Sequence, residues 1–193
     1  MWTIPNQITL FRIFLIPVFI LVYYAPIEWN HFGAFAVFWI ASVSDALDGY
    51  LARKLNQSSA FGAFIDPVAD KLMVAAALIM IAESYGDWWI SVPAMLMISR
   101  EIFISALREF MSSRGKRDVV AVSTLGKYKT AAQMLGIMGL IWQPDYDIPL
   151  IIFDFPHEIL MFAAYSFYFV ATVLTVWTMY LYFKAAWPEL KGN

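Results

Sequence analysis

Apolar residues gather in six long runs along this chain, with short polar segments between them. The runs cover residues 8–25, 32–54, 62–83, 88–111, 125–142 and 157–184. Each run approaches the ~20 residues that an α-helix needs to cross about 30 Å of hydrocarbon. The pattern therefore predicts an all-α integral membrane protein with six transmembrane helices. No internal repeat or Gly/Ser-rich linker divides the chain, so we expect a single domain over residues 1–193.

Composition supports this class and excludes others. Hydrophobic residues make up 61% of the chain, whereas soluble domains average about 45–50%. The net charge of -2 is too close to neutrality to suggest a partner nucleic acid. The absence of Cys excludes disulfides and thiolate-bound metals. His31 and His157 lie far apart near the ends of apolar runs, so we expect interfacial residues and no His-based zinc site.

At the connections and the ends of the runs, basic residues occur only at alternate positions along the chain. They are Arg53 and Lys54, then Arg114, Lys116, Arg117, Lys127 and Lys129, and finally Lys184 and Lys191. The intervening connections carry acidic residues without a Lys or Arg. Because basic loops stay on the cytoplasmic side, both termini are predicted to be cytoplasmic. Trp88, Trp89, Trp142 and Tyr146 then fall at the opposite membrane interface, where aromatic belts occur.

The most informative polar residues form one pattern, D-x2-D-G-x2-A-R-x8-G-x3-D-x3-D. Its members are Asp45, Asp48, Gly49, Ala52, Arg53, Gly62, Asp66 and Asp70. An ionised Asp near the centre of a membrane helix costs roughly 2.5–3.5 kcal/mol, so four cost on the order of 10 kcal/mol. Some partner must compensate this charge, and bound cations are the obvious candidate.

Helical spacing brings these acids onto common faces. Asp45 and Asp48 are three residues apart, and Asp66 and Asp70 are four apart. The short link LNQSSA predicts that the two helices are antiparallel neighbours whose acids face one pocket. Carboxylates without His or Cys select Mg²⁺, Mn²⁺ or Ca²⁺, and four of them can hold two ions ~4 Å apart, a geometry suited to phosphate esters.

The remaining members of the pattern suit a bulky phosphorylated ligand. Gly49 and Ala52 carry the smallest side chains on their helix, which lets a ligand approach the backbone. Arg53 ends that helix, where a guanidinium can meet a phosphate. Gly62 provides a second point of close approach across the gap.

Two other classes of protein place acids in membrane helices. An ion-coupled transporter is one, but the chain shows no inverted repeats and its acids cluster at one end of the helices, away from the midplane. An intramembrane prenyltransferase is another, but its Asp-rich motifs would lie on well-separated helices. A lone D-x-x-D is usually a solvated helix face, whereas the full eight-residue pattern is far too specific for chance.

At these residues the chain resembles the CDP-alcohol phosphotransferases, and it matches their signature at every position. The resemblance implies six transmembrane helices around a polar cavity open to the cytoplasm. It also implies transfer of a phosphatidyl group from CDP-diacylglycerol to an alcohol, with release of CMP. Carried over by position, Asp45, Asp48, Asp66 and Asp70 ligate two divalent cations, Mg²⁺ or Mn²⁺, and Asp70 is also the general base. Residues that would hold the CDP moiety are Gly49, Ala52, Arg53 and Gly62.

Three stretches outside the signature resemble family members whose acceptor is sn-glycerol 3-phosphate. They read IPNQITLFRIFLIP, SREIFISALREFM and VSTLGKYKTAAQM. The implied product is phosphatidylglycerol phosphate, at the committed step of phosphatidylglycerol and cardiolipin synthesis. A homodimer in the bacterial inner membrane, surrounded by membrane lipids, is also implied. Inositol phosphate, serine and phosphatidylglycerol remain alternative acceptors, and serine is the nearest rival although it lacks a phosphate.

The acceptor phosphate needs basic partners. Glu101, Ser105, Arg108 and Ser112 share one face of the fourth helix, from which Arg108 can reach the cavity mouth. Lys127 and Lys129 begin the next helix on the same side. The alternatives are a buried ion pair for Arg108 and membrane anchoring for the two lysines. Arg100 is expected to pair with Glu101 or with another helix.

The start of the first helix offers further candidates. Asn6, Thr9 and Arg12 precede or begin this helix on the predicted cytoplasmic side. Asn6 and Thr9 can donate hydrogen bonds to phosphate oxygens, and we expect all three residues to contact substrate. The alternative is helix capping for Asn6 and Thr9 and an anionic-lipid contact for Arg12.

Overall fold

The computed structural model describes residues 4–55, 60–120, 124–144, 147–149 and 154–191, and these form six long helices. The α-helices are α1 (Ile4–Tyr23), α2 (Asn30–Leu55), α3 (Ala60–Tyr85), α4 (Trp88–Ser113), α5 (Thr124–Trp142) and α6 (His157–Leu190). A short 3-10 helix, η1 (Arg117–Val120), precedes α5. The two-residue strands β1 (Ile148–Pro149) and β2 (Asp154–Phe155) pair antiparallel before α6. The six apolar runs therefore predicted the helices to within a few residues.

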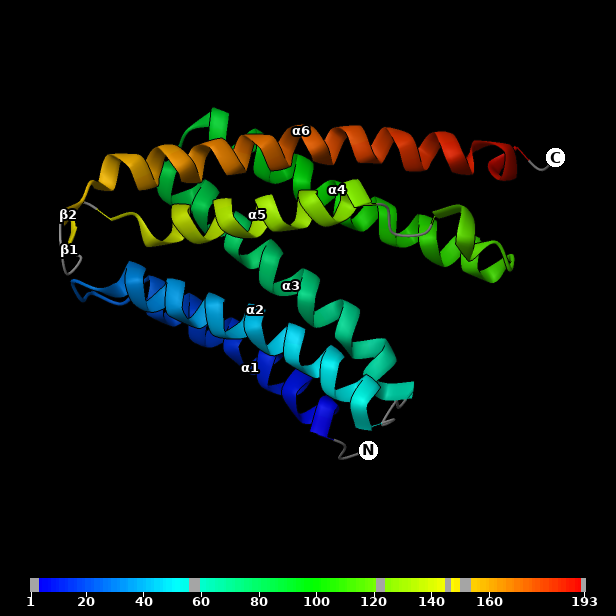
Figure 1. Ribbon diagram of the computed structural model, residues 1–193, viewed down its shortest axis with the longest axis horizontal. Helices are drawn as coiled ribbons and strands as arrows, with labels where there is room; N and C mark the ends of the chain where they lie inside the picture. The colour runs from blue at the N-terminus through cyan, green and yellow to red at the C-terminus, as the bar shows by residue number, and fades with distance from the viewer. Residues whose placement is uncertain (1–3, 56–59, 121–123, 145–146, 150–153, 192–193) are drawn as a thin grey trace.

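The helices form two groups that α3 connects (Figure 1). α5 and α6 lie side by side and make the most extensive contact in the molecule, with α4 packed on α6. α1 and α2 form the second close pair. α3 runs obliquely between the groups and contacts α1 on one side and α4 on the other. The site residues on α3 are thus within reach of both groups.

The expectation that α2 and α3 are close neighbours was wrong for most of their length. α1 packs extensively against both of them, whereas α2 and α3 contact each other only slightly. Within the described residues, α1 is therefore the main packing partner that α2 and α3 share. Acids on α2 and α3 are consequently connected through side chains of α1.

Close packing of α5 on α6 depends on glycine. A Cβ atom added at Gly136 would lie 2.7 Å from the backbone nitrogen of Tyr168, closer than real Cβ contacts. A Cβ at Gly139 would collide with Ala164. Small residues let helix backbones approach in this way in membranes. Gly136 and Gly139 therefore allow the close approach of α5 to α6.

Three helices carry segments long and apolar enough to cross a bilayer by length and composition, counted over the described residues. They are Asn6–Tyr23, Trp88–Ser113 and His157–Leu190, which indicates an integral membrane protein. The helices α2 and α3 carry the acids of the signature, and α5 carries Lys127 and Lys129. The polar residues that lower the hydropathy of these helices are therefore the candidate site residues themselves.

Candidate active site

Helices α2 and α3 position the acids of the signature as the spacing predicted. Asp45 lies on α2, and Asp66 and Asp70 lie one turn apart on α3. Gly62 is buried one turn before Asp66. Asp48, Gly49, Ala52 and Arg53 belong to α2, but their side chains lie outside the described part of the chain.

α1 supplies the partners of two of these acids. Arg12 donates a hydrogen bond from Nη1 to Oδ1 of Asp45, and its Nη2 lies 4.0 Å from Oδ1 of Asp66. Thr9 donates from Oγ1 to the same oxygen of Asp66. Asn6, Thr9 and Arg12 recur every three residues on α1 and are all buried. They are turned toward the protein interior, and Arg12 forms an ion pair with Asp45 there, which argues against the alternative of a lipid contact.

Two small cavities meet at Asp70. One is lined by Asp45, Asp70, Arg12 and Ser42, together with apolar side chains of α2 and α3. The second has a volume of about 60 Å³ and is lined by Asp70, Lys71, Glu101, Lys129 and Gln133, among others. Asp70 therefore stands between Asp45 of α2 and the charged side chains of Glu101 on α4 and Lys129 on α5.

The donor chemistry around Asp70 fits a hard divalent ion. Asp45, Asp66 and Asp70 offer carboxylate oxygens from two helices at one end of the molecule. Within the described residues, these three carboxylates are not gathered within coordination distance of one point. The Arg12 guanidinium lies between Asp45 and Asp66 and supplies positive charge there.

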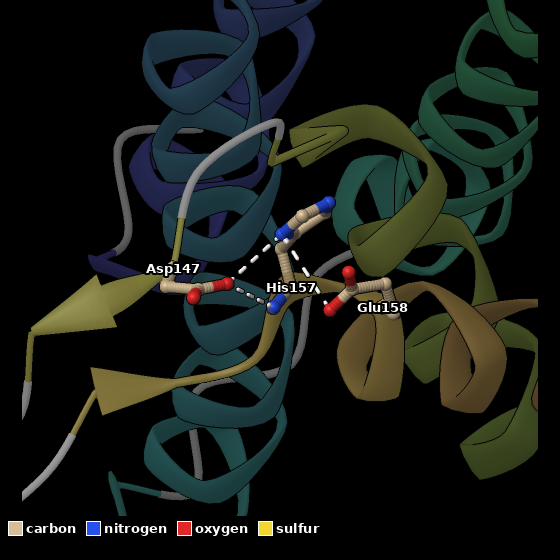
Figure 2. Close-up of side chains that lie close together, drawn as sticks. All are labelled: Asp147, His157 and Glu158. Atoms are coloured by element: carbon tan, nitrogen blue, oxygen red, sulfur yellow. Dashed lines mark hydrogen bonds and ion pairs between the residues drawn. The ribbon is translucent and has the colours of Figure 1, made fainter.

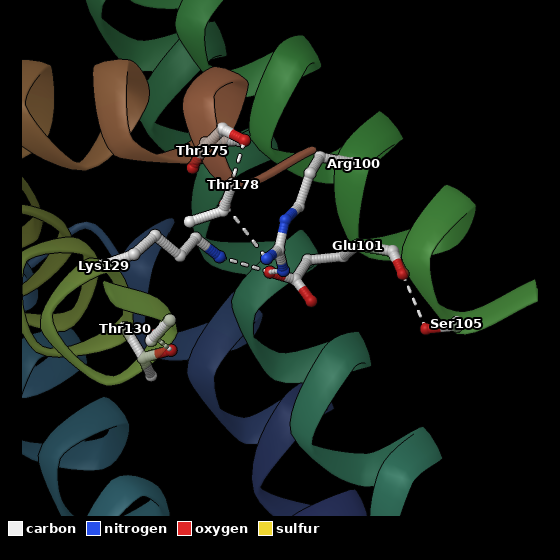
Figure 3. Close-up of polar contacts among 8 residues, drawn as sticks. Arg100, Glu101, Ser105, Lys129, Thr130, Thr175 and Thr178 are labelled. Carbon is white, nitrogen blue, oxygen red and sulfur yellow. Dashed lines mark hydrogen bonds and ion pairs between the residues drawn. The ribbon is translucent and has the colours of Figure 1, made fainter. Parts of the chain in front are cut away.

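A buried ionic network joins α4, α5 and α6 beside the second cavity (Figure 3). Lys129 donates from Nζ to Oε1 of Glu101, and Nη1 of Arg100 lies 3.1 Å from the same oxygen. Nη2 of Arg100 also donates to Oγ1 of Thr178, at 3.2 Å. The expected pairing of Arg100 with Glu101 is confirmed. The network holds two cations for one carboxylate, which leaves the region next to Asp70 basic.

The other candidates for the acceptor phosphate lie farther from this cavity. The guanidinium carbon of Arg108 sits 5.5 Å from the ring centroid of Tyr182 on α6, and neither cavity includes Arg108. Lys127 is exposed, whereas Lys129 is only 2% exposed. Among the basic candidates, Lys129 is thus the one that the fold brings to Asp70.

A second polar cluster, which the sequence did not reveal, lies at the opposite end of α1 and α2 (Figure 2). Nδ1 of His157 lies 2.9 Å from Oδ1 of Asp147 and 3.7 Å from Oε2 of Glu158. The backbone N–H of His157 donates to the same Asp147 oxygen at 3.0 Å. These hydrogen bonds hold the pKa of Asp147 below its usual value.

Helix capping explains the Asp147 cluster. Pro156 at the N-cap position of α6 makes no side-chain capping bond, and Asp147 reaches across from the β1 segment to do so. These three residues are of metal-ligating types. They lie beside β1 and β2 at the left edge of Figure 1, near the carboxyl end of α1, whereas Thr9 and Arg12, which contact the signature acids, belong to the amino-terminal half of that helix. No short-range sequence signal links Asp147 to a helix that begins ten residues later.

Comparison with known proteins identifies the family of the chain. The chain belongs to the CDP-alcohol phosphatidyltransferase family, whose model matches residues 2–183. It is similar to the CDP-diacylglycerol–glycerol-3-phosphate 3-phosphatidyltransferase of Escherichia coli (strain K12), at 48% identity over 189 residues. That match covers 98% of this chain and 97% of the relative. Relatives of the same name in Shigella sonnei (strain Ss046) and Shigella flexneri serotype 5b (strain 8401) match at 48% and 47% identity with the same coverage.

Proposed function

We propose that this protein transfers the phosphatidyl group of CDP-diacylglycerol to sn-glycerol 3-phosphate, giving phosphatidylglycerol phosphate and CMP. The observation that carries this proposal is the 48% identity, over 98% of the chain, to enzymes named for that reaction. The complete eight-residue signature supports it, as do the three described acids gathered at one end of α1, α2 and α3. The product would enter phosphatidylglycerol and cardiolipin synthesis.

Enzymes of this family use divalent metal ions, and we assign two Mg²⁺ or Mn²⁺ ions to the signature acids. Asp45, Asp48, Asp66 and Asp70 would hold them. When bound, the ions supply positive charge that neutralises the pyrophosphate and polarises the phosphorus carrying diacylglycerol. Gly49, Ala52, Arg53 and Gly62 would hold the CDP moiety, because small side chains admit the nucleotide to the backbone and Arg53 can bind a phosphate.

Asp70 serves as the general base in this proposal. Its carboxylate accepts the proton of the 1-hydroxyl of glycerol 3-phosphate as that oxygen bonds to the phosphorus of the phosphatidyl group. The bond from this phosphorus to the CMP oxygen breaks, and CMP leaves with the electron pair. Asp70 lines both cavities, with Asp45 beside it in one and Lys71 and Lys129 beside it in the other, and this position supports the role.

Lys129 is our first candidate for the acceptor phosphate, because it lines the cavity that contains Asp70. Lys127 and Arg108 are candidates at the rim of that region. We assign Asn6, Thr9 and Arg12 to the side of the site that holds the signature acids. Thr9 contacts the carboxylate of Asp66 there, and Arg12 contacts that of Asp45. This division places the nucleotide-activated donor against α1, α2 and α3, and the acceptor against α4 and α5.

The membrane arrangement follows from the loop charges. We propose that all six helices span the bacterial inner membrane as one domain, with both termini and the acid cavity on the cytoplasmic side. Placement at membrane depth suits a donor whose acyl chains stay in lipid. A homodimer is the assembly that the family resemblance favours, and chemical cross-linking in membranes tests it.

One assay tests the reaction and its acceptor. Purified protein is given CDP-diacylglycerol with glycerol 3-phosphate, inositol phosphate, serine or phosphatidylglycerol, with and without Mg²⁺, and the lipid product is identified. We expect CMP release only with metal, and phosphatidylglycerol phosphate as the product. An ion-coupled transporter would release no CMP. Near-normal turnover by Asp70→Asn would remove the base assignment, and Asp45→Ala tests the ligand role through the metal dependence of turnover.

A further inference from the structure

Lys71 carries a positive charge at the candidate site that no ion pair among the described residues neutralises. It follows Asp70 on α3, and its side chain is partly buried. Its charge acts on the carboxylates of Asp70 and Glu101 from a distance, without a hydrogen bond to either. Lys129, in contrast, donates directly to Glu101. An ammonium group at membrane depth is costly, so an unpaired one indicates a binding role.

An apolar cavity adjoins Lys71 between α3 and α4. It has a volume of about 150 Å³, and its walls include Ala75, Leu78 and Ile98. Apolar cavities of about this size stay dry and can hold hydrocarbon. Lys71 lines both this cavity and the polar cavity that contains Asp70. A polar compartment and an apolar one therefore meet at Lys71.

Helix direction shows how the apolar cavity runs. Lys71 and Leu78 are seven residues apart on one face of α3, so about 10 Å of helix separates them. Leu78 and Ile98 lie nearer the short α3–α4 connection than Lys71 and Glu101 do. The cavity therefore extends from Lys71 toward that connection, which is away from the cytoplasmic side in the proposed membrane arrangement.

The surroundings of the cavity suit an acyl chain that enters from the bilayer. Leu72 and Ile102 line the cavity and are 49% and 65% exposed, so the lipid around the helices can reach it. A ligand of both compartments must carry an anionic group at one end and hydrocarbon at the other. Glycerol 3-phosphate offers only the anion, whereas a diacylglycerol attached to phosphate offers both.

We propose that Lys71 binds the phosphoryl group that carries diacylglycerol, while the α3–α4 cavity receives the adjoining part of one acyl chain. The inference rests on the proposed function, to which it adds a residue that binds the donor and a place for the lipid. The ammonium group donates to an anionic phosphoryl oxygen, a contact stronger than a neutral hydrogen bond. Lys71 then serves the donor, and Lys129 serves the acceptor.

Kinetics of CMP release by the purified full chain test the role of Lys71. We expect Lys71→Met to raise the KM for CDP-diacylglycerol about 10-fold, the effect of losing one charge-assisted contact, and to change the KM for glycerol 3-phosphate less than about 2-fold. Lys71→Arg retains the charge and should recover most of the loss. Lys184→Met removes an exposed lysine of α6 and should leave both constants unchanged. A larger effect of Lys71→Met on the acceptor KM would overturn the inference.

Photo-crosslinking locates the lipid without turnover. The probe is CDP-diacylglycerol with a diazirine in the first half of one acyl chain, and phosphatidylcholine with the same diazirine is the control. We expect CDP-diacylglycerol to attach at Ala75, Leu78 or Ile98, and phosphatidylcholine to attach only at exposed residues such as Leu72 and Ile102. The same attachment pattern from both probes would overturn the inference. A wild-type protein that releases no CMP would overturn the proposed function, and attachment of the CDP-diacylglycerol probe inside the cavity would still support the lipid site.

Discussion

Lys129 donates a hydrogen bond from Nζ to Oε1 of Glu101, and this contact joins α5 to α4 beside Asp70. Lys129 is 2% exposed, so its charge depends on a protein partner for compensation. Glu101 has a second cation, Arg100, at 3.1 Å. The same lysine thus satisfies an internal carboxylate and presents a positive charge to the cavity proposed for the acceptor.

Variants of this pair separate its structural role from substrate binding. Removing one partner of a buried ion pair costs ~3–5 kcal/mol, and we expect about 2–3 kcal/mol for Lys129→Met because Arg100 still serves Glu101. The double variant Lys129→Met/Glu101→Gln should regain much of this stability. Its KM for glycerol 3-phosphate should stay raised, because the phosphate contact is still missing. Lys127→Met, at an exposed site, should change stability by less than ~0.5 kcal/mol. Restoration of a normal KM in the double variant would exclude Lys129 from the acceptor site.

Arg108 provides a second test of the acceptor region. Its guanidinium rests over Tyr182, an arrangement worth about 0.5–1 kcal/mol. We expect Arg108→Ala to raise the KM for glycerol 3-phosphate more than the KM for CDP-diacylglycerol. Arg114→Ala removes another arginine that rests on an aromatic ring, Phe110, and should leave both constants unchanged. Equal increases in the two constants for Arg108→Ala would contradict the acceptor role.

Helix packing predicts a large effect of one methyl group. Gly136→Ala places a Cβ 2.7 Å from the backbone nitrogen of Tyr168, so α5 and α6 must separate at a cost of about 1–3 kcal/mol. Thermal unfolding in detergent measures this loss. Gly33→Ala is the comparison variant, because its Cβ would meet one side-chain atom, Cγ1 of Val22 at 2.8 Å, and no helix backbone. Similar losses for the two variants would show that the close α5–α6 contact is not required.

The cap of α6 predicts a response to acid. Hydrogen bonds from His157 to Asp147 lower the pKa of that carboxyl from 3.8. Since the pKa is lower in the folded protein, the stabilisation is complete above the unfolded pKa and disappears as pH falls through the folded pKa, below about pH 4. Amide hydrogen exchange in the first turn of α6 should therefore accelerate below about pH 4 relative to that of Asp147→Asn at the same pH. Glu158→Gln serves as the control and should show the same acceleration of exchange as the wild type. If Asp147→Asn also shows this acceleration, the carboxylate of Asp147 is not its cause.

Hydropathy predicted the helices well because a bilayer demands long apolar segments. The spacing of Asp45, Asp66 and Asp70 also predicted their helical placement, since three- and four-residue intervals fix one face. Packing between helices was less predictable. A short α2–α3 link favoured direct contact, but the sequence contains no signal that α1 would pack against both helices and bring Thr9 and Arg12 to the acids.

Long-range partnerships account for the rest of what was missed. Glu101 meets Lys129 from another helix, and a hydrogen bond of this kind leaves no periodic pattern. The distinction between Lys127 and Lys129 also follows from packing, since one side chain faces out and the other is buried. The cap supplied by Asp147 depends on a turn, and turn geometry is set by several residues together.

The pairing of Arg12 with Asp45 has a consequence for biogenesis. Asp45 follows Arg12 by 33 positions, so α1 emerges from the ribosome before the carboxylate that neutralises its guanidinium has emerged. Until then the charge is costly in the hydrocarbon, and the long side chain must reach back to the headgroups of the leaflet where it entered. Arg12 thus helps to orient the nascent chain first, and becomes an internal residue only once α2 has followed it into the membrane.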